Sequence, residues 1–351
     1  MNYFMYMEFG EKRFLSETIT SITSLVQAMP DTEKYYIVVL ATHPKELKEN
    51  LTVPLDHIIT HEILQNVLNE WTENETYFYQ AKVKAIQYFM DLYASDVIFI
   101  DSDTVIYRDL LGLFDELSDH FIMNFQCRGV HELLEMVEGQ EEALYSDEKI
   151  NLRYRQRIKC FSMLYEGISY NQYTYKATKD SKICNSGVIG IAYRHRKILN
   201  EVEKLVLYLY HHSDYGASEE VAFSVVFQKY GTLMLCDDML THYYECKETR
   251  LVAGLLMDIL AADERDQLTQ LIGKYGVRDI SQYDIHISEC SAFMDYVRIY
   301  KGKQEAYFGK RFEGKCYTSE EKLKAMERIN KRCFRKWIRN EMTDTRSISV
   351  K

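Results

Sequence analysis

Short apolar runs alternate with segments of helical periodicity through residues 1–100, and this alternation constrains the fold more than any other feature of the chain. The runs at residues 3–7, 36–41 and 97–100 are continuous, as in strands that are buried on both faces of a sheet. Between them, residues 16–29 and 77–92 repeat apolar side chains every three or four positions, which predicts helices. Strand–helix–strand order predicts an α/β fold with a mostly parallel sheet, in which ligands bind beyond the carboxyl ends of the strands.

The alternation is interrupted between residues 128 and 180, which are charged at first and then rich in tyrosine, and we expect an inserted helical segment there. Further strands and helices are expected at residues 57–60, 183–192, 198–210, 219–230 and 232–236. We therefore divide the chain into a domain of residues 1–300, interrupted by the insertion, and an extension of residues 301–351.

Composition excludes several classes of protein. With 46% hydrophobic and 27% charged residues, the chain of 351 residues is globular rather than disordered. A net charge of −10 argues against broad nucleic-acid binding. The eight cysteines form no CxxC pair, which indicates reduced thiols rather than a zinc module or a disulfide framework. The amino-terminal residues lack the pattern of a signal peptide and no run reaches about 18 apolar residues, so we expect a cytoplasmic protein.

Two aspartates, Asp101 and Asp103, directly follow the apolar strand VIFI. Carboxylates separated by one residue at the carboxyl end of a strand can turn toward one hard cation, and such a cation can bridge a diphosphate. An aspartate at this position can also form an Asx turn or cap a helix, so the pair does not decide the function by itself.

The context of this pair is more specific. The run VIFIDSDTVIYRDLLGLF, preceded by Lys84 and followed at a distance by CNSGVIGI, resembles the A-type (GT-A) glycosyltransferases, in particular family 8, which includes glycogenin and bacterial galactosyltransferases. The resemblance covers about residues 1–290 without the insertion. It implies an α/β fold of the GT-A type, with a Rossmann-like mixed sheet flanked by helices. It also implies metal-dependent transfer of a sugar from a nucleotide-diphosphate donor, with a UDP-sugar expected, to a hydroxyl of a glycan or glycolipid.

The resemblance assigns roles to individual residues. Asp101 and Asp103 match the pair that holds Mn2+ or Mg2+ on the donor diphosphate, with Ser102 near the ribose, and Lys84 matches a basic residue that contacts the donor. The residues matched to the base and ribose are Met7, Glu8, Phe9 and Gly10, and those matched to the donor sugar and acceptor are Asn185, Ser186 and Gly187.

Two acidic residues match the position of the family's acidic residue beside the reactive carbon of the sugar, namely Glu219 and Glu220. A carboxylate there can orient the donor, stabilise positive charge or accept the proton of the acceptor. Each assignment has a structural alternative: Lys84 as a solvated lysine, Asn185–Gly187 as a bulge, and the glutamates as partners of a helix dipole.

The third metal ligand of the family is a histidine in a pattern resembling HFxGxxKPW, which this chain lacks. We prefer His286, whose distance beyond Glu220 is the more family-like, over the alternative His242, which arrives early but has Lys247 downstream. Lys247 or a residue of the basic extension would then replace the lysine that grips the leaving diphosphate.

Two alternatives belong to other functional classes. Asp101 and Asp103 also match the nucleophile and the acid/base of a haloacid-dehalogenase-like phosphatase, with Asp237 and Asp238 as its late acidic motif. The position of Asp101 and Asp103 along the chain argues against a phosphatase, because the aspartate pair of that superfamily usually follows the first strand. The second alternative is a binding protein on a glycosyltransferase-like fold, without catalysis.

The insertion and the extension suggest partners. The tyrosines of residues 145–175 suit sugar stacking, so we expect this segment to shape acceptor recognition. Residues 315–351 carry eleven Lys or Arg against five Asp or Glu. Within residues 320–340 a basic face lies over an amphipathic helical pattern, which predicts either a packed terminal helix or peripheral contact with an anionic membrane. The basic residues of that face are Arg332, Arg335, Lys336 and Arg339.

Overall fold

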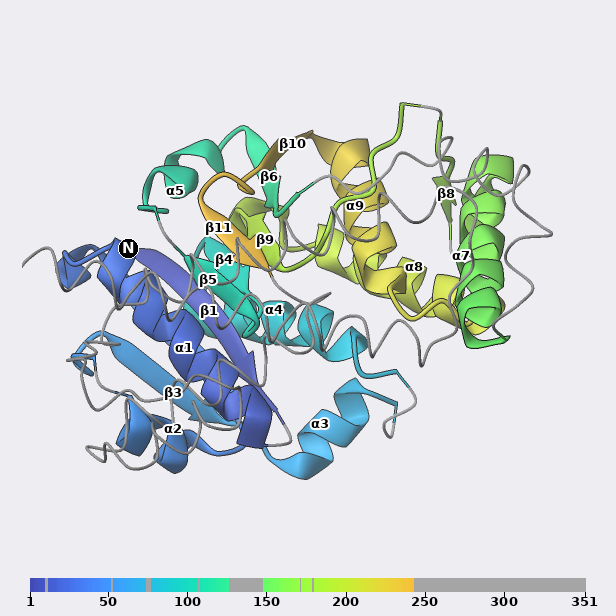
Figure 1. Ribbon diagram of the computed structural model, residues 1–351. Coiled ribbons are helices and arrows are strands. Elements are labelled where there is room, and N and C mark those ends of the chain that lie inside the picture. Colours follow the sequence, from blue (N-terminus) through green and yellow to red (C-terminus); the bar gives the residue numbers. More distant parts are fainter. Residues whose placement is uncertain are drawn as a thin grey trace, which may run out of the picture.

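The computed structural model describes residues 1–242, except 10–11, 52, 74–76, 107, 126–147, 171 and 179 (Figure 1). Gly10, Lys247, His286 and the extension therefore lie outside the described residues. In chain order the elements are β1 (Asn2–Glu8), α1 (Lys12–Ala28), β2 (Tyr35–Ala41), α2 (Pro44–Asn50), β3 (Ile58–Glu62), α3 (Gln65–Trp71), α4 (Gln80–Tyr93), β4 (Val97–Ile100), β5 (Thr104–Ile106), α5 (Gly112–Glu116), β6 (His120–Met123), α7 (Glu148–Glu166), β7 (Ile168–Tyr170), β8 (Tyr173–Tyr175), β9 (Val188–Ile191), α8 (Ile198–Ser213), α9 (Ser218–Tyr230), β10 (Thr232–Leu235) and β11 (Leu240–His242).

A seven-stranded mixed sheet in the order β10-β6-β9-β4-β1-β2-β3 forms the centre of the molecule. The pairs β1–β2, β1–β4, β2–β3 and β6–β10 are parallel, whereas β9 runs antiparallel to both β4 and β6. The expected α/β architecture, a mixed sheet flanked by helices, is confirmed. Because β9 is reversed, the residues that precede it lie at the sheet edge where β4 and β6 end.

The strands are apolar throughout because both faces of the sheet are covered. Successive residues of β4 alternate between the two cores: Val97 and Phe99 pack with α4, α8 and α9, whereas Ile98 and Ile100 pack with α1 and α2. Figure 1 shows α1 lying across one face of this sheet. All four side chains of β4 are at most 1% exposed. This double burial explains why the strands lack the polar–apolar alternation of a sheet with one face in water.

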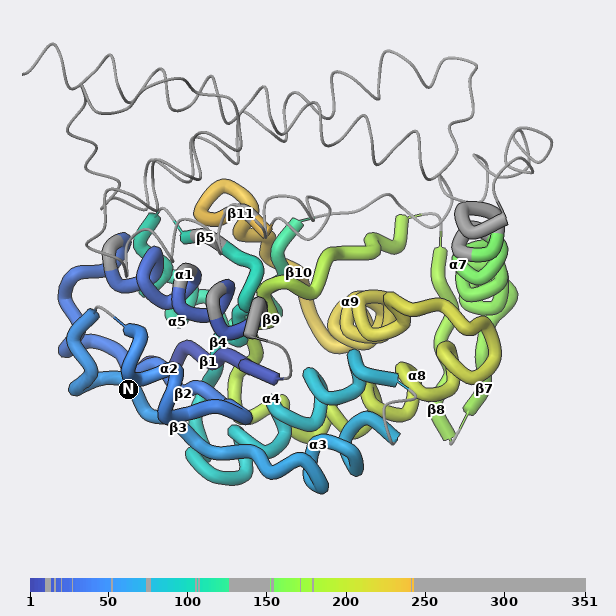
Figure 2. The backbone as a smooth tube through the Cα atoms, turned by 60° about the horizontal axis from the view of Figure 1, so that its bottom comes forward, coloured from blue at the N-terminus to red at the C-terminus, as the bar shows by residue number. Residues whose placement is uncertain are grey.

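The segment of residues 128–180 is partly described and contains more than the expected helix. Its helix α7 is followed by a hairpin in which Ile168 pairs with Tyr175 and Tyr170 with Tyr173. Figure 2 shows α7 and this hairpin together beyond α8 and α9, at the end of the molecule away from β3. The tyrosine-rich stretch thus forms short strands that the sequence pattern did not predict, because strands of three residues are too short to show a period.

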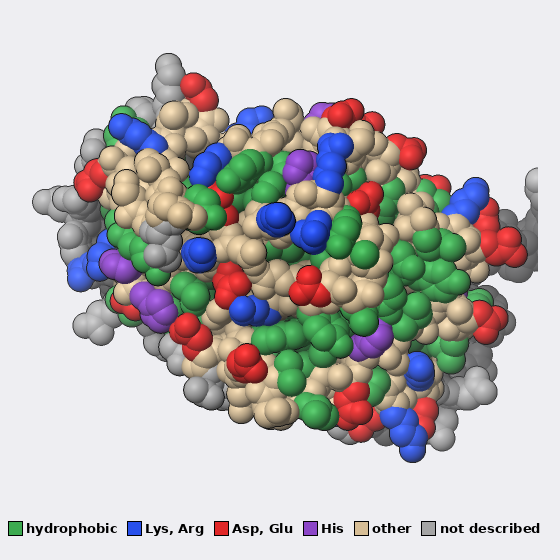
Figure 3. All heavy atoms as spheres, turned by 180° about the vertical axis from the view of Figure 1, so that it is seen from behind, with side chains coloured by type: hydrophobic (Ala, Val, Ile, Leu, Met, Phe, Trp, Pro, Cys, Tyr) green, Lys and Arg blue, Asp and Glu red, His purple; other side chains and the backbone are tan. Residues whose placement is uncertain are grey.

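The expected strand at residues 183–192 is shorter in the structure, where β9 begins at Val188. The residues before it form an irregular stretch at the sheet edge instead of continuing the ladder. On the surface seen from behind, basic, acidic and hydrophobic side chains are interspersed (Figure 3). Among the described residues, no helix combines the length and the hydropathy that crossing a membrane requires.

Candidate functional site

The reversed strand β9 creates the candidate site at the carboxyl ends of β4 and β6. Ile100, the last residue of β4, pairs with Val188, the first residue of β9. The backbone N–H of Asp101 then donates to the carbonyl of Gly187 at 2.8 Å, and that of Asn124 donates to the carbonyl of Asn185 at 3.2 Å. The aspartates and the Asn185–Gly187 segment, far apart in the sequence, therefore meet at one edge of the sheet.

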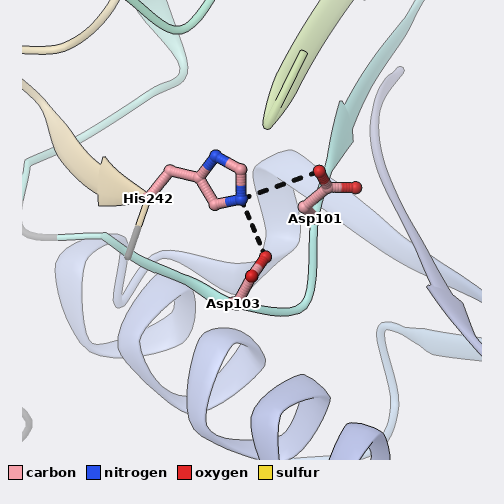
Figure 4. Close-up of side chains that lie close together, drawn as sticks. All are labelled: Asp101, Asp103 and His242. Carbon is pink, nitrogen blue, oxygen red and sulfur yellow. Dashed lines mark hydrogen bonds and ion pairs between the residues drawn. The ribbon is translucent and has the colours of Figure 1, made fainter. Parts of the chain in front are cut away.

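A second, two-stranded sheet adds a histidine to this edge. Strand β11 pairs antiparallel with β5, which places His242 opposite Thr104, next to Asp103. One ring nitrogen of His242, Nε2, lies 2.8 Å from Oδ1 of Asp103 and 3.8 Å from Oδ2 of Asp101. Figure 4 shows this nitrogen facing both carboxylates. One potential ligand atom from each of these three residues lies within 4.8 Å of the other two.

The other ring nitrogen of His242 is held by Asn185. Nδ1 lies 2.6 Å from Oδ1 of Asn185, and the same oxygen accepts the backbone N–H of Gly187 at 2.9 Å, which fixes the orientation of the amide. Since a carboxamide oxygen only accepts, Nδ1 carries a proton and Nε2 is the nitrogen that can bind a cation. Gly187 makes room for this packing, because a Cβ there would come within 2.6 Å of Cγ of His242.

Electrostatics of the site favour the protonated imidazole when no cation is bound. Burial of His242 opposes protonation, but the charge of Asp103, its hydrogen bond and the charge of Asp101 outweigh burial and raise the pKa of His242. The two carboxylates thus form a locus of negative charge that a proton on His242 partly neutralises.

A buried lysine, Lys82, connects the aspartates with the Asn185–Gly187 segment. Nζ of Lys82 donates to Oδ2 of Asp101 at 2.8 Å and to both the carbonyl and the hydroxyl oxygen of Ser186 at 3.0 Å. Burial opposes its charge, but Asp101 and then Glu219 raise the pKa of Lys82 above its ordinary value.

Lys84, which the resemblance assigned to the donor, instead forms a 2.6 Å ion pair with Glu203 of α8. The structure does not bring Lys84 into the cluster around Asp101.

Both glutamates at the start of α9 face the Asn185–Gly187 segment. Glu219 accepts hydrogen bonds from the hydroxyls of Ser186 and Tyr77, each at 3.2 Å, and the Nδ2 group of Asn185 donates to Glu220 at 2.6 Å. Burial raises the pKa of Glu219 to about 7, and the charge of Lys82 opposes that rise. Burial also raises the pKa of Glu220. At neutral pH these carboxyl groups are therefore closer to accepting a proton than glutamates in water.

Aromatic side chains lie beside the glutamates. Tyr77, whose hydroxyl bonds Glu219, stacks on Tyr210 with ring centroids 4.0 Å apart. Tyr79, two residues on, is 49% exposed, and its ring centroid lies 5.9 Å from that of Tyr77. Burial and the charge of Glu219 raise the pKa of Tyr79.

The end of β1 lies at the same sheet edge, but its side chains are already engaged. The carboxylate of Glu8 is fully buried and accepts the backbone N–H of His43 at 3.0 Å, with the His43 ring 3.2 Å away. Phe9 is buried against Trp71. Met7 is half-buried and packs against the core of α4, α8 and α9. Ser102 lies in the turn between the two aspartates.

The structure therefore brings together Asp101, Asp103, Asn185, Ser186, Gly187, Glu219 and Glu220, with His242, the alternative histidine, at the aspartates. The preferred His286 lies outside the described residues. Residues that the sequence interpretation missed are Lys82, Tyr77 and Asn124. The two aspartates matched to the late acidic motif of a phosphatase, Asp237 and Asp238, are exposed in the β10–β11 turn. Asp238 forms an ion pair with Arg108 at 3.0 Å.

No protein-family model matches this chain, and no curated protein matches it. Similar solved structures are glycosyltransferases. They include the galactosyltransferase LgtC in complex with donor and acceptor sugar analogues, 13% identical over 66% of this chain and 72% of that chain with a TM-score of 0.40. Mouse xyloside xylosyltransferase 1 is 12% identical over 67% and 85% with a TM-score of 0.41, and the mannosyltransferase Ktr4p from S. cerevisiae is 10% identical over 69% and 70% with a TM-score of 0.39.

Proposed function

We propose that this protein is a metal-dependent glycosyltransferase of the GT-A type, which moves a sugar from a nucleotide-diphosphate donor to a hydroxyl acceptor. The observation that carries the proposal is the pairing of two charge clusters at one sheet edge. The aspartates with His242 lie on one side of the Asn185–Gly187 segment, and Glu219 with Glu220 lies on the other. The first cluster suits a diphosphate with its cation, and the second suits the sugar carbon that reacts.

The residues of the first cluster fit a divalent cation. Carboxylate oxygens suit Mg2+ and Mn2+, whereas an imidazole nitrogen favours Mn2+ of these two. Asp101, Asp103 and Nε2 of His242 would hold the ion, and Asn185 already orients the imidazole, as expected for a supporting residue of a metal site. A cation bound there neutralises charge on the diphosphate that leaves.

The chain's own residues supply the remaining chemistry. In the transfer, the bond between the anomeric carbon and the diphosphate oxygen breaks with its electron pair on the diphosphate, and the acceptor oxygen forms the new bond to that carbon. Glu219 and Glu220 provide negative charge where positive charge develops, and a carboxylate with a raised pKa can take the proton of the acceptor hydroxyl. Lys82 fixes Asp101 and Ser186 relative to each other.

The expected donor is a UDP-sugar and the expected acceptor a glycan or glycolipid. The half-exposed Tyr79 beside the carboxylates offers an aromatic face on which a sugar can stack. Assignment to family 8, the role of residues 145–175 and membrane contact through residues 320–340 stay predictions of the sequence.

The proposal is tested by thermal unfolding with a panel of nucleoside diphosphates and nucleotide-sugars, with and without Mn2+. A ligand that binds only the folded chain raises the melting temperature. We expect a Mn2+-dependent shift with one nucleotide, together with release of the free diphosphate when the matching sugar donor is supplied. Asp103→Asn should abolish the shift. Asp119→Asn should preserve it, because Asp119 is exposed and directly precedes β6, at the end of that strand away from the site.

Two outcomes would overturn the proposal. Hydrolysis of a generic phosphate ester without any nucleotide-dependent shift would favour the phosphatase with Asp101 as nucleophile. Neither binding nor hydrolysis with any compound of the panel would favour a binding protein.

A further inference from the structure

The helix α7 carries an arginine, Arg157, that forms no ion pair within 4.0 Å among the described residues. The guanidinium of Arg157 packs over the ring of Phe161, with Cζ 5.6 Å from the ring centroid. Its Nε atom is buried and has no hydrogen-bond partner in the part of the chain that the structure describes. A half-buried guanidinium with a free donor costs desolvation energy that a bound anion would recover.

A continuous series of contacts links Arg157 to the start of α9, where Glu219 and Glu220 lie. The ring of Phe161 lies 6.0 Å from that of Tyr215. The carbonyl of Tyr215 accepts the hydroxyl of Ser218 at 2.6 Å, and Ser218 is the first residue of α9. Glu219 and Glu220 follow directly. The start of α9 therefore connects Arg157 with the two carboxylates.

The charge of Arg157 reaches both Glu220 and Tyr215. Burial is the main influence on the pKa of Glu220 and raises it, while Lys82, His242 and Arg157 act in the opposite direction. Burial likewise raises the pKa of Tyr215, and Arg157 is the largest influence against that rise. Glu220 is thus subject to positive charge from His242 at the cation site and from Arg157 on α7.

This arrangement separates two places where an anion can bind. The aspartates and His242 with a cation suit the diphosphate, whereas Arg157 lies on the helix of the insertion and acts on the other side of the site through its charge on Glu220. Guanidinium groups bind carboxylate and phosphate oxygens through two parallel hydrogen bonds. We propose that Arg157 determines acceptor specificity by binding an oxyanion substituent, a carboxylate or a phosphate, on the acceptor sugar. This inference rests on the proposed function, because it assigns the acceptor side of that reaction.

The test compares sugars that differ only in one anionic group. Glucose, glucuronate and glucose 6-phosphate form one set, and galactose, galacturonate and galactose 6-phosphate form a second. Their binding to the full-length chain is measured by saturation-transfer NMR titration without donor. In at least one set we expect an anionic member to bind about tenfold more tightly than the neutral sugar, the difference that one charge-assisted contact of about 1.4 kcal/mol provides.

Substitutions identify the residue responsible. Arg157→Gln should remove the difference between the anionic and the neutral sugar, whereas Arg155→Gln, at an exposed position of the same helix, should preserve it. Arg157→Lys keeps the charge but not the paired donors, so it should retain part of the preference for phosphate and lose more of that for carboxylate. The carboxylate and phosphate arms thereby identify which oxyanion is recognised.

Equal binding of all members in the wild-type chain, including no measurable binding of any, would overturn the inference, as would a preference that survives in Arg157→Gln. Melting temperatures of the variants verify folding, and if Arg157→Gln does not fold, Arg157→Lys decides by the loss of the carboxylate preference. The Mn2+-dependent nucleotide shift is measured separately and should be the same in Arg157→Gln and wild type. Failure of that shift in the wild type would reject the proposed function, whereas failure of the sugar comparison alone rejects only the role of Arg157.

Discussion

Nε2 of His242 lies 2.8 Å from Oδ1 of Asp103, although 139 residues separate them in the chain. The contact exists because β11 returns to pair antiparallel with β5, so His242 stands opposite Thr104. A pairing of three-residue strands would be marginal by itself, and the hydrogen bond that Nδ1 donates to Oδ1 of Asn185 adds a second restraint on the ring. Position and orientation of the imidazole therefore depend on different parts of the sequence.

Removing the support of the imidazole should weaken cation binding without touching a ligand. In Asn185→Ala the Nδ1 hydrogen of His242 loses its acceptor, and we expect Mn2+ affinity to fall about 10–100-fold, the range found for second partners of metal-bound histidines. Titration calorimetry with Mn2+ measures the change. Asn50→Ala, at an exposed position in α2, is the control and should bind as the wild type does. Unchanged affinity in a folded Asn185→Ala chain would contradict the role of Asn185.

Gly187 is predicted to tolerate no side chain. A Cβ at this position would overlap the ring of His242 and come within 2.8 Å of Oδ1 of Asn185, so Gly187→Ala must displace one of them. We expect a loss of roughly 1–3 kcal/mol in the free energy of unfolding, as for other overpacked sites, together with weaker Mn2+ binding. Denaturant unfolding gives the first quantity. Gly112→Ala is the matched control, because nothing lies within 4 Å of its added Cβ, and its stability should stay within about 0.5 kcal/mol of the wild type.

Much of the fold could be predicted from the sequence because the strands are buried on both faces and therefore read as continuous apolar runs. An α/β fold with a mostly parallel sheet followed from that pattern, and the mixed sheet was implied by the resemblance to the GT-A glycosyltransferases. The reversal of β9 did not follow from the pattern, because the direction of a strand depends on its connections and leaves no local signal. The β7–β8 hairpin was missed for a related reason, since each of its strands has only three residues.

The aspartates of the site could be located because they directly follow a recognisable strand. The lysine could not be chosen from the resemblance, since Lys82 and Lys84 are two positions apart on one helix and point to different sides. The spacing along the helix could have identified Lys82 as the buried lysine. Lys82 lies four residues before Ile86 and seven before Phe89, on the same helix face, and both of these residues are fully buried. The histidine depended on long-range pairing, and spacing along the chain favoured His286, which lies outside the described residues.

The two lysines of α4 should therefore differ sharply in their contribution. Lys82→Met leaves the carboxylate of Asp101 without its 2.8 Å partner and removes a positive charge that acts on Glu219, which we expect to cost on the order of 3–5 kcal/mol of unfolding free energy. Lys84→Met breaks a more exposed pair with Glu203, so its cost should stay below about 1 kcal/mol. Denaturant unfolding of both variants gives the comparison, and similar losses in the two would refute the assignment of Lys82 as the lysine of the site.

Glu219 should make the stability of the wild-type chain depend on pH in a way that Glu219→Gln does not share. Burial raises the pKa of Glu219 from the ordinary 4.5 to about 7, so the folded state favours the protonated carboxyl. Its contribution to stability is fully present below about pH 4.5 and declines until the pH has risen through about 7. Glutamine remains neutral and imitates the protonated form, so Glu219→Gln should match the wild type near pH 4.5 and exceed it in melting temperature near pH 8. Glu62→Gln, at an exposed position in β3, should differ from the wild type equally at both pH values. A difference in melting temperature between Glu219→Gln and the wild type that stays constant from pH 4.5 to 8 would show that folding does not raise the pKa of Glu219. The proposed role of Glu219 as proton acceptor would then be rejected.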